Sequence, residues 1–310
     1  MTTGKQHTHR FILIEPNTFG FNVQTAATNV FQNKTPDNLH AQKVTRDRAM
    51  SEFKSVTKKL TNEELELFIL PSPTDSITPD AVFPNNWISF YEGGVMVLHP
   101  MLAPNRRKER QTENVLSTLK KAGISISKTF DYTSHEKDGH FLEGTGSVVL
   151  DRINKVAYAV ESARTSKKVF EHFCKDLGYT SVFFHGIDNK FVPVYHTNVL
   201  MSIGDKFAVI CLEAIADVRE RDYVKEMLEK TGRTIITITL GQMFDFCANI
   251  LEVVDKKGSK KIILSETAYE SLTEEERKKL SSFGKLVPLS IPTIESVGGG
   301  SARCLVAEIF

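Results

Sequence analysis

The chain has 310 residues, 41% of them hydrophobic and 25% charged, which is typical of a globular protein with a large core. Its 39 basic and 38 acidic residues give a formal net charge of +1, which argues against a nucleic-acid partner or an anionic membrane, and no stretch approaches the roughly 18 apolar residues of a membrane span. The four cysteines are widely spaced and the first ten residues lack a secretory signal, so we expect a cytoplasmic protein with neither disulfides nor a metal site.

The first quarter of the chain gives a weak pattern. Residues 10–16 read as a strand that ends at a proline, and residues 41–59 have mixed helical character. A second short strand is predicted at 65–71, again ended by a proline. Residues 71–84 are rich in Pro, Ser, Thr and Asp and are predicted to be a loop.

From residue 86 onward one unit repeats four times, in the order strand, turn, strand, helix, strand. The first unit has strands at 86–90, 95–99 and 124–130 and a helix at about 106–121, whose basic start we interpret as a solvated face with one inward arginine at most. The other units have strands at 147–150, 156–160 and 181–184 with a helix at 166–177; strands at 199–203, 207–212 and 234–239 with a helix at 218–231; and strands at 250–254, 262–264 and 286–289 with a helix at 273–282.

A polar or thiol-bearing residue opens each unit, and these residues recur at 57, 53, 53 and 55 residues: Asn86, Glu143, His196, Asn249 and Cys304. A fifth unit would begin at Cys304 and be completed by the N-terminal strand and the residues up to Pro71. Closing such repeats into a ring removes exposed sheet edges. We therefore expect one catalytic α/β domain over residues 1–310, in which equivalent positions of five units meet at one axial cavity.

The residues that would meet there are suited to nucleophilic catalysis. Cys304 follows three glycines, Gly298 to Gly300, whose backbone N–H groups can approach a ligand and stabilise an oxyanion. His196 can promote thiolate formation and move protons, and Glu143 precedes glycines that would let its carboxylate face the cavity. A buried structural thiol, a core histidine and a surface turn are the alternatives, and Asn249 is interpreted as structural.

Four segments of the sequence resemble the guanidine-modifying superfamily of arginine deiminases, amidinotransferases, dimethylarginine hydrolases and citrulline ureidases. They are Phe83-Pro84-Asn85-Asn86-Trp87, Leu142-Glu143-Gly144, Tyr195-His196-Thr197-Asn198 and the terminal Gly-Gly-Gly-Ser-Ala-Arg-Cys. The resemblance begins near residue 10 and implies a five-bladed α/β propeller, the pentein fold, with ββαβ repeats. It also implies Cys304 as nucleophile, His196 as general acid and base, Glu143 as a substrate-binding carboxylate, and no metal or organic cofactor.

The sequence departs from the deiminases of this superfamily at two positions. Those that act on arginine usually have aspartate where Asn86 and Asn198 stand. A guanidinium only donates hydrogen bonds and suits carboxylates, whereas the carbonyl oxygen of a neutral ureido group needs a donor, which an asparagine amide offers. We therefore expect Asn86 and Asn198, together with Asn85, to bind the ureido group of citrulline; the alternative is that these asparagines only cap turns.

Arg164 resembles the segment that binds the substrate carboxylate in this superfamily, while Arg106 and Arg303 are weaker candidates. The predicted activity is that of a citrulline ureidase, which releases ornithine, ammonia and carbon dioxide through a covalent cysteine intermediate. A deiminase acting on arginine or another guanidine, an amidinotransferase, and a catalytically silent ring that binds an amino acid or a partner remain alternatives. The expected partner is a small molecule; a homo-oligomer stays open, and Asp131 to His140 is a candidate lid. The polar side chains of that loop are more often exposed to solvent than catalytic.

Overall fold

The structure, a computed structural model, describes residues 4–36, 38–73 and 75–310. Within these ranges, fifteen strands form five three-stranded sheets. In every sheet the middle strand pairs antiparallel with one neighbour and parallel with the other. Four sheets are continuous in sequence: β3 (Ile88–Tyr91), β4 (Val95–Leu98) and β5 (Lys128–Asp131); β6 (Val149–Asp151), β7 (Val156–Val160) and β8 (Thr180–Phe184); β9 (Met201–Ile203), β10 (Phe207–Ile210) and β11 (Thr234–Thr237); β12 (Leu251–Val254), β13 (Lys260–Ser265) and β14 (Lys285–Leu289).

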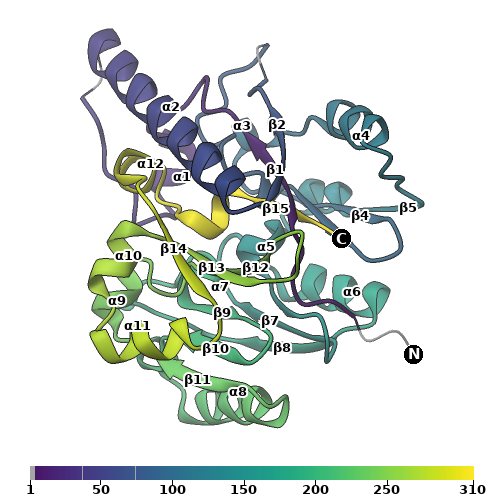
Figure 1. The fold of residues 1–310 in the computed structure, drawn as a ribbon, viewed down its shortest axis with the longest axis vertical. Coiled ribbons are helices and arrows are strands. Elements are labelled where there is room, and N and C mark those ends of the chain that lie inside the picture. The colour runs from purple at the N-terminus through teal and green to yellow at the C-terminus, as the bar shows by residue number, and fades with distance from the viewer. Residues whose placement is uncertain (1–3, 37, 74) are drawn as a thin grey trace.

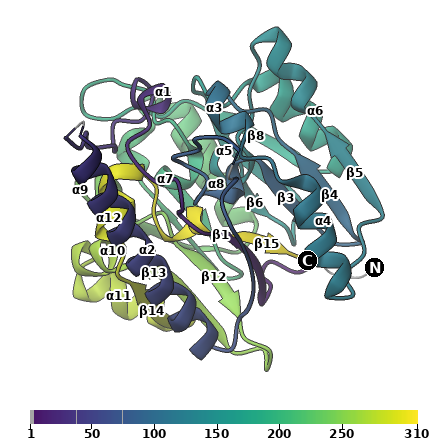
Figure 2. The ribbon, with the colours of Figure 1, turned by 90° about the horizontal axis from the view of Figure 1, so that it is seen from above.

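The fifth sheet joins the two ends of the chain. β1 (Arg10–Ile14) pairs antiparallel with β15 (Ala307–Ile309), where Phe11 lies opposite Glu308, and parallel with β2 (Glu66–Leu70). Figures 1 and 2 show the purple β1 beside the yellow β15. The predicted five-bladed α/β ring with a split fifth unit is therefore confirmed.

A helix on the outside of the ring connects the middle and third strands of each sheet (Figures 1 and 2). Each of these helices buries an apolar stripe against its sheet, as α6 does with Val169, Phe170 and Phe173. The middle strands are apolar on both faces, and all five residues of β7 are buried. The outer helices are α2 (Leu39–Asn62), α4 (Thr112–Lys121), α6 (Lys167–Leu177), α8 (Val218–Lys230), and the pair α10 (Glu266–Ser271) and α11 (Glu274–Ser281).

The helix predicted at 106–121 is interrupted. Its first turn is a separate helix, α3 (Pro104–Arg107), and α4 begins only at Thr112. Arg106 and Glu109 are both buried at this interruption and pair with each other, so Arg106 is the one inward arginine that the sequence allowed, whereas the prediction of a solvated face is wrong at Glu109. Other short helices are α1 (Val23–Ala26), α9 (Leu240–Phe244), α12 (Pro292–Gly298) and the 3₁₀ turns η2 (Thr133–Asp138) and η3 (Leu212–Ala214).

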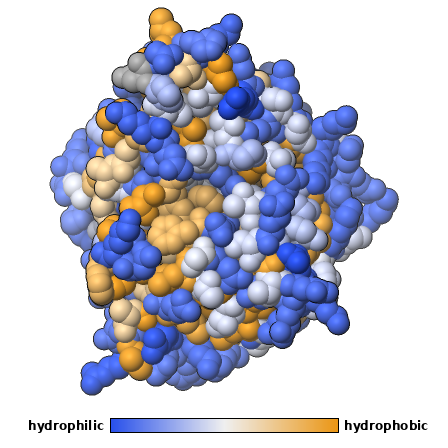
Figure 3. All heavy atoms as spheres, turned by 90° about the vertical axis from the view of Figure 1, so that its left-hand side faces the viewer, coloured by the Kyte–Doolittle hydropathy of each residue, from blue (hydrophilic) through white to orange (hydrophobic). Residues whose placement is uncertain are grey.

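The face of the protein that Figure 3 shows is mostly hydrophilic, with a local exception. Figure 3 shows a patch of apolar residues bordered by polar ones, on the side where α9, α10 and α12 lie in Figure 1. Exposed apolar patches with a polar border are common at association surfaces. Whether the protein is a homo-oligomer stays a prediction. No helix within the described ranges is long and apolar enough to cross a membrane.

Candidate active site

Single helical turns line the axis of the ring, immediately before the first strands of the sheets. Glu143 is the N-cap of α5 (Gly144–Ser147), and His196 is the N-cap of α7 (Thr197–Leu200). Asn86 ends the 3₁₀ turn η1 (Pro84–Asn86), and Cys304 lies in η4 (Ala302–Leu305). All four side chains are at most 3% exposed. The turns are too short to give a helical period in the sequence, and Asn86 was wrongly predicted as the first residue of a strand.

The His196 imidazole is held by the Glu143 carboxylate, with 2.9 Å between Nε2 and Oε2. Burial would raise the pKa of Glu143, but Arg164, His196 and Arg106 outweigh it and lower the pKa to about 2. Burial lowers the pKa of His196 to about 4, although Glu143 opposes this change. The pair is therefore a neutral imidazole and an ionised carboxylate near neutral pH. Because the carboxylate can only accept, Nε2 carries the proton and Nδ1 is free to take one.

Gly146 leaves the room that these side chains need. A Cβ atom at this position would lie 2.5 Å from Asn86 Nδ2 and 2.7 Å from His196 Nδ1. Distances this short are steric collisions. The glycine that follows Glu143 by three residues thus places the Asn86 amide and the imidazole against the same stretch of backbone.

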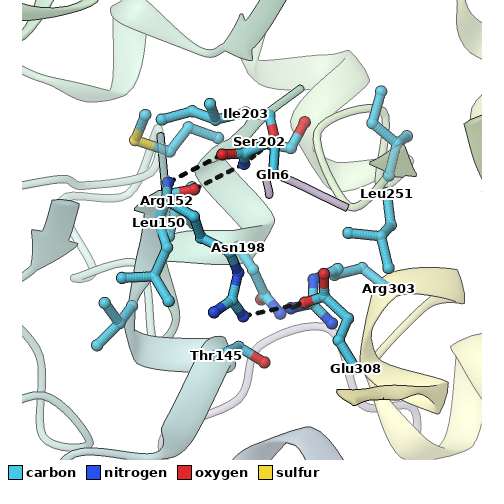
Figure 4. Close-up of a pocket in the computed structure, with 14 residues that line it drawn as sticks. Gln6, Thr145, Leu150, Arg152, Asn198, Ser202, Ile203, Leu251, Arg303 and Glu308 are labelled. Atoms are coloured by element: carbon cyan, nitrogen blue, oxygen red, sulfur yellow. Dashed lines mark hydrogen bonds and ion pairs between the residues drawn. The ribbon is translucent and has the colours of Figure 1, made fainter. Parts of the chain in front are cut away.

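The Cys304 thiol lies against two side-chain amides. Asn198 Nδ2 and Asn249 Nδ2 each stand 3.4 Å from Cys304 Sγ, in position to donate a hydrogen bond. The interpretation of Asn249 as merely structural missed this contact, although its place in the repeat pointed to the axis. Asn198 also lines a second, axial pocket with Arg303 (Figure 4), and it lies between that pocket and the thiol.

The predicted oxyanion donors in the glycine run are partly occupied. The Gly299 N–H donates to Glu295 O (2.8 Å), as the end of α12 requires. The Gly299 carbonyl accepts from the Tyr195 hydroxyl at 2.5 Å. Gly299 has φ +64° and faces Asn29, so it is needed for the shape of the turn.

Arg106 and its partners form a buried charge network next to the thiol. Arg106 binds Glu109 through two hydrogen bonds of 2.9 Å and donates through Nη1 to Asn86 Oδ1 at 2.8 Å. Asp80 Oδ2 lies 3.8 Å from Arg106 Nε. Asp80 and Glu109 were not predicted from the sequence; a spacing of three residues between an arginine and a glutamate on one helical turn was the available signal for Glu109.

The cavity above the thiol is small. Its volume is about 10 Å³, roughly the space that one water occupies. The residues around it come from four blades and from the N-terminal segment: Asn29, Asp80, Phe83, Asn86, Arg106, Arg164, Tyr195, His196, Gly298, Gly299, Gly300 and Cys304. Asn85 does not line this cavity, and its backbone oxygen instead accepts from Thr145 Oγ1 at 3.4 Å.

Residues 22–29 cover the cavity. Arg164 Nη2 donates to Thr25 O (3.0 Å) and to Thr28 Oγ1 (2.9 Å), and Asn29 Nδ2 donates to Gly299 O (3.2 Å). A cavity of about 10 Å³ has no room for a ligand larger than a water, so a larger ligand could enter only if this segment moved. None of the residues of the candidate lid at 131–140 lines this cavity, and Glu136 of that loop accepts a hydrogen bond from the Met101 N–H group at 2.8 Å.

Arg303 faces away from the cavity. Its Nη2 donates to Glu308 Oε2 at 2.7 Å, and its Nη1 donates to Val306 O at 3.1 Å. Figure 4 shows Arg303 beside Glu308 in the axial pocket, where Arg152 also reaches Glu308, with 3.6 Å between Arg152 Nη2 and Glu308 Oε2. Among the residues that the structure describes, no group of three or more His, Cys, Asp or Glu side chains is arranged to hold a metal ion.

Five sheets around one axis, with a buried cysteine, histidine and carboxylate before their first strands, define an α/β propeller of the guanidine-modifying class. The model of the family described as N,N dimethylarginine dimethylhydrolase, eukaryotic, matches residues 15–310, and the chain therefore belongs to this family. Among curated proteins, no sequence match is found.

Solved structures of three proteins share the fold. The N-terminal domain of ArgZ, in a variant covalently bound to a reaction intermediate, has a TM-score of 0.72 and 16% identity and covers 96% of this chain and 97% of that chain. Unliganded AgrE has a TM-score of 0.71 at 17% identity, covering 96% of this chain but 39% of that longer chain. A cysteine-to-serine variant of DDAH from Pseudomonas aeruginosa, complexed with citrulline, has a TM-score of 0.66 at 15% identity and covers 97% of this chain and 99% of that chain.

Proposed function

We propose that the protein hydrolyses the ureido group of citrulline to ornithine, ammonia and carbon dioxide, with Cys304 as the nucleophile. The observation that carries the proposal is the Asn86 amide. Its Oδ1 accepts from Arg106, and its Nδ2 has no hydrogen-bond partner among the described residues although it is buried at the cavity. An unpaired buried donor is costly, and the carbonyl oxygen of a ureido group is an acceptor that would satisfy it.

A second unpartnered group at the cavity suits an amino acid. Asp80 is 2% exposed, and its Oδ1 has no hydrogen-bond partner among the described residues. This free carboxylate oxygen is an acceptor for an α-ammonium group. For the α-carboxylate, Arg164 is the better candidate of the two cavity arginines, because Arg106 already holds Glu109 through both of its oxygens. Opening the cover would release Arg164 from Thr25 and Thr28.

The reaction uses the neutral imidazole as a proton shuttle. His196 takes the thiol proton as Cys304 Sγ bonds to the ureido carbon, and Asn86 donates to the oxygen as it becomes negative. The bond from carbon to the δ-nitrogen then breaks, and His196 gives its proton to that nitrogen, which leaves as ornithine. Water gives a proton to His196 and adds to the S-carbamoyl group. The carbon–sulfur bond breaks, its electron pair and the proton held by His196 go to the sulfur, and the carbamic acid product decomposes to ammonia and carbon dioxide.

The solved relatives support an amino-acid ligand of this kind. ArgZ is described as an arginine dihydrolase, AgrE has been solved with ornithine, and the Pseudomonas enzyme has been solved with citrulline. These ligands share an α-amino acid head and a chain that ends in nitrogen. The unpartnered Asp80 oxygen and Asn86 NH₂ group in the cavity of this protein suit the two kinds of group that such ligands carry.

A product assay tests the proposal. The purified protein is offered citrulline, arginine, agmatine and dimethylarginine, and ornithine and ammonia are measured. Ornithine and ammonia from citrulline are expected, and Cys304→Ala should abolish both while leaving the protein folded. Citrulline formed from arginine, with no turnover of citrulline itself, would overturn the ureidase assignment.

The family description favours one second candidate, the hydrolysis of dimethylarginine. The same nucleophile and imidazole would serve it. The substrate's substituted guanidinium would then have to pair its donors with acceptors in the cavity, where the unpartnered Asn86 Nδ2 is a donor. Release of dimethylamine from dimethylarginine in the same assay, faster than turnover of citrulline, would favour this second activity.

A further inference from the structure

We propose that Asn249 is a catalytic residue. Its side-chain N–H, together with that of Asn198, stabilises the negative charge on the Cys304 sulfur when the sulfur attacks the substrate and again when the sulfur leaves the adduct. This role rests on the proposed function only for the identity of the substrate. It can be measured on the free protein, without turnover.

The orientation of the Asn249 amide is fixed by its surroundings. Asn249 is fully buried, its Oδ1 accepts from the backbone N–H of Arg303 at 3.1 Å, and its Nδ2 donates to the backbone carbonyl of Asn198 at 3.0 Å. Turning the amide over would break both hydrogen bonds, because an oxygen would face a carbonyl and an NH₂ group would face an N–H. The second hydrogen of Nδ2 therefore remains for Cys304 Sγ, at 3.4 Å.

The sulfur has a second donor, and the two arginines that share its cavity, Arg106 and Arg164, are hydrogen-bonded to other groups. Asn198 Nδ2 stands 3.4 Å from Sγ, and Asn198 is itself held by Asn249 through its carbonyl. His196 is the group expected to provide a positive charge, yet it is bound to Glu143 and burial lowers its pKa to about 4. Two neutral amide dipoles thus do what a cation does beside many reactive thiols.

The same amide also fits the protonated thiol. Cys304 Sγ lies 3.6 Å from Asn249 Oδ1, within reach of a weak S–H···O hydrogen bond. When the S–H proton passes to His196, the sulfur becomes an acceptor and Asn249 Nδ2 becomes its partner. When the carbon–sulfur bond of the carbamoyl adduct breaks, the electron pair returns to sulfur and meets the same two N–H groups. Both chemical steps therefore place negative charge against these amides.

A neutral substrate makes this arrangement necessary. A guanidinium ligand brings a positive charge close to the thiolate and stabilises it on binding. A ureido group brings none, so the protein has to supply the stabilisation from its own donors. Asn198 and Asn249 are those donors.

The test is the alkylation of Cys304 by iodoacetamide in the absence of substrate, followed as a function of pH. Asn249→Ala removes the donor, and alkylation near pH 7 is expected to be about tenfold slower, because a hydrogen bond to a charged group is lost. The rates of variant and parent should converge at high pH, where all of the thiol is ionised. Cys304→Ser gives the background of the three other cysteines.

Two further variants keep the experiment decisive. Asn249→Asp nearly preserves the shape of the side chain and can still accept from Arg303, but it places an oxygen where the donor stood, so alkylation should slow at least as much. Asp217→Ala removes the side-chain cap of the outer helix α8, where Asp217 Oδ1 accepts from Arg219 N at 2.8 Å, and it controls for loss of stability without touching the thiol. It should alkylate at the parent rate.

The outcomes separate this proposal from the proposed function. The role of Asn249 would be overturned if the pH profile of alkylation of Asn249→Ala matched that of the parent. If the alanine variant does not fold, the profile of Asn249→Asp decides in the same way. If the variants are alkylated slowly but the parent protein does not turn over citrulline, the role of the amides is supported and the ureidase assignment is overturned.

Discussion

Glu143 and His196 open equivalent helical turns in neighbouring blades, and their side chains share a buried hydrogen bond of 2.9 Å. The bond joins the second and third units of the repeat and leaves Nδ1 of the imidazole free. Because both groups are buried, their protonation is set by each other and by Arg164 and Arg106. The pair is therefore also a determinant of how stability depends on pH.

The protein should lose stability on acidification through His196. Its pKa is lowered from 6.5 to about 4 in the folded state, so between these values the unfolded chain binds a proton that the folded chain does not. The free energy of unfolding attributable to His196 therefore falls as the pH decreases from 6.5 toward 4. Urea unfolding at several pH values checks this, with His196→Asn as the variant that lacks this contribution. An unchanged pH slope in His196→Asn would contradict the prediction.

Replacing the free donor of Asn86 by an acceptor should impair the use of citrulline. Asn86→Asp keeps an oxygen for Arg106 but removes the NH₂ group, and kcat/KM for citrulline is expected to fall by about 10²-fold or more. Asn198→Asp, added to it, should lower the rate further, because it also removes a donor to the thiol. Asn85→Ala is the matched control: Asn85 is its sequence neighbour, does not line the cavity, and should retain most activity. Citrulline kinetics that do not change in the double variant would show the amide argument to be wrong.

Gly146→Ala should disturb the site out of proportion to its size. The new methyl group would collide with Asn86 Nδ2 at 2.5 Å and His196 Nδ1 at 2.7 Å. We expect kcat to fall by about 10²-fold, since small displacements of catalytic groups have effects of that order, and a loss of stability of about 1–3 kcal/mol. Gly241→Ala is the control, because its Cβ would meet only Thr239 Oγ1 at 3.7 Å. Steady-state kinetics and thermal unfolding of both variants measure the two effects.

Arg164→Ala should reduce the selectivity for substrates that carry an α-carboxylate. The parent is expected to prefer citrulline strongly over its decarboxylated analogue, N-carbamoylputrescine. Loss of an arginine–carboxylate pair should reduce that preference by about tenfold or more. Because Arg164 Nη1 also lies 3.5 Å from Glu143 Oε2, turnover of both substrates will fall. The ratio of the two kcat/KM values is therefore the deciding quantity, and a ratio equal to that of the parent would assign the carboxylate to another group.

The sequence predicted the ring because its opening residues recur at a nearly constant interval. The spacing from Asn86 to Cys304 located all five units, including the split one. This prediction needed no knowledge of side-chain contacts. The cover at residues 22–29 was not predicted, since an irregular segment held by isolated side-chain bonds has no period. Asp80 was missed for the same reason: its role depends on Arg106, Asn22 and Thr25, which meet it only in the folded chain.

Asn249 shows a second limit of prediction from the sequence. Its position in the repeat placed it at the axis, but residue type alone did not distinguish a turn cap from a donor to sulfur. Likewise Arg106 lay in a basic cluster typical of a solvated helix, and only burial with Glu109 shows that it faces inward. The repeat predicts where in the fold a side chain lies, whereas the groups that the side chain contacts depend on packing.

The pairing of β1 with β15 also has a consequence for how activity arises during folding. Cys304 lies three residues before β15, and the Thr8 hydroxyl reaches the Ile309 carbonyl across 301 positions of sequence. Contacts of such separation carry the largest loop-closure entropy and tend to form late. A folding intermediate with an open ring would expose two unpaired strand edges and hold its thiol out of place, so it would aggregate readily and catalyse nothing. The time course with which thiol reactivity appears during refolding would thus show when the ring closes.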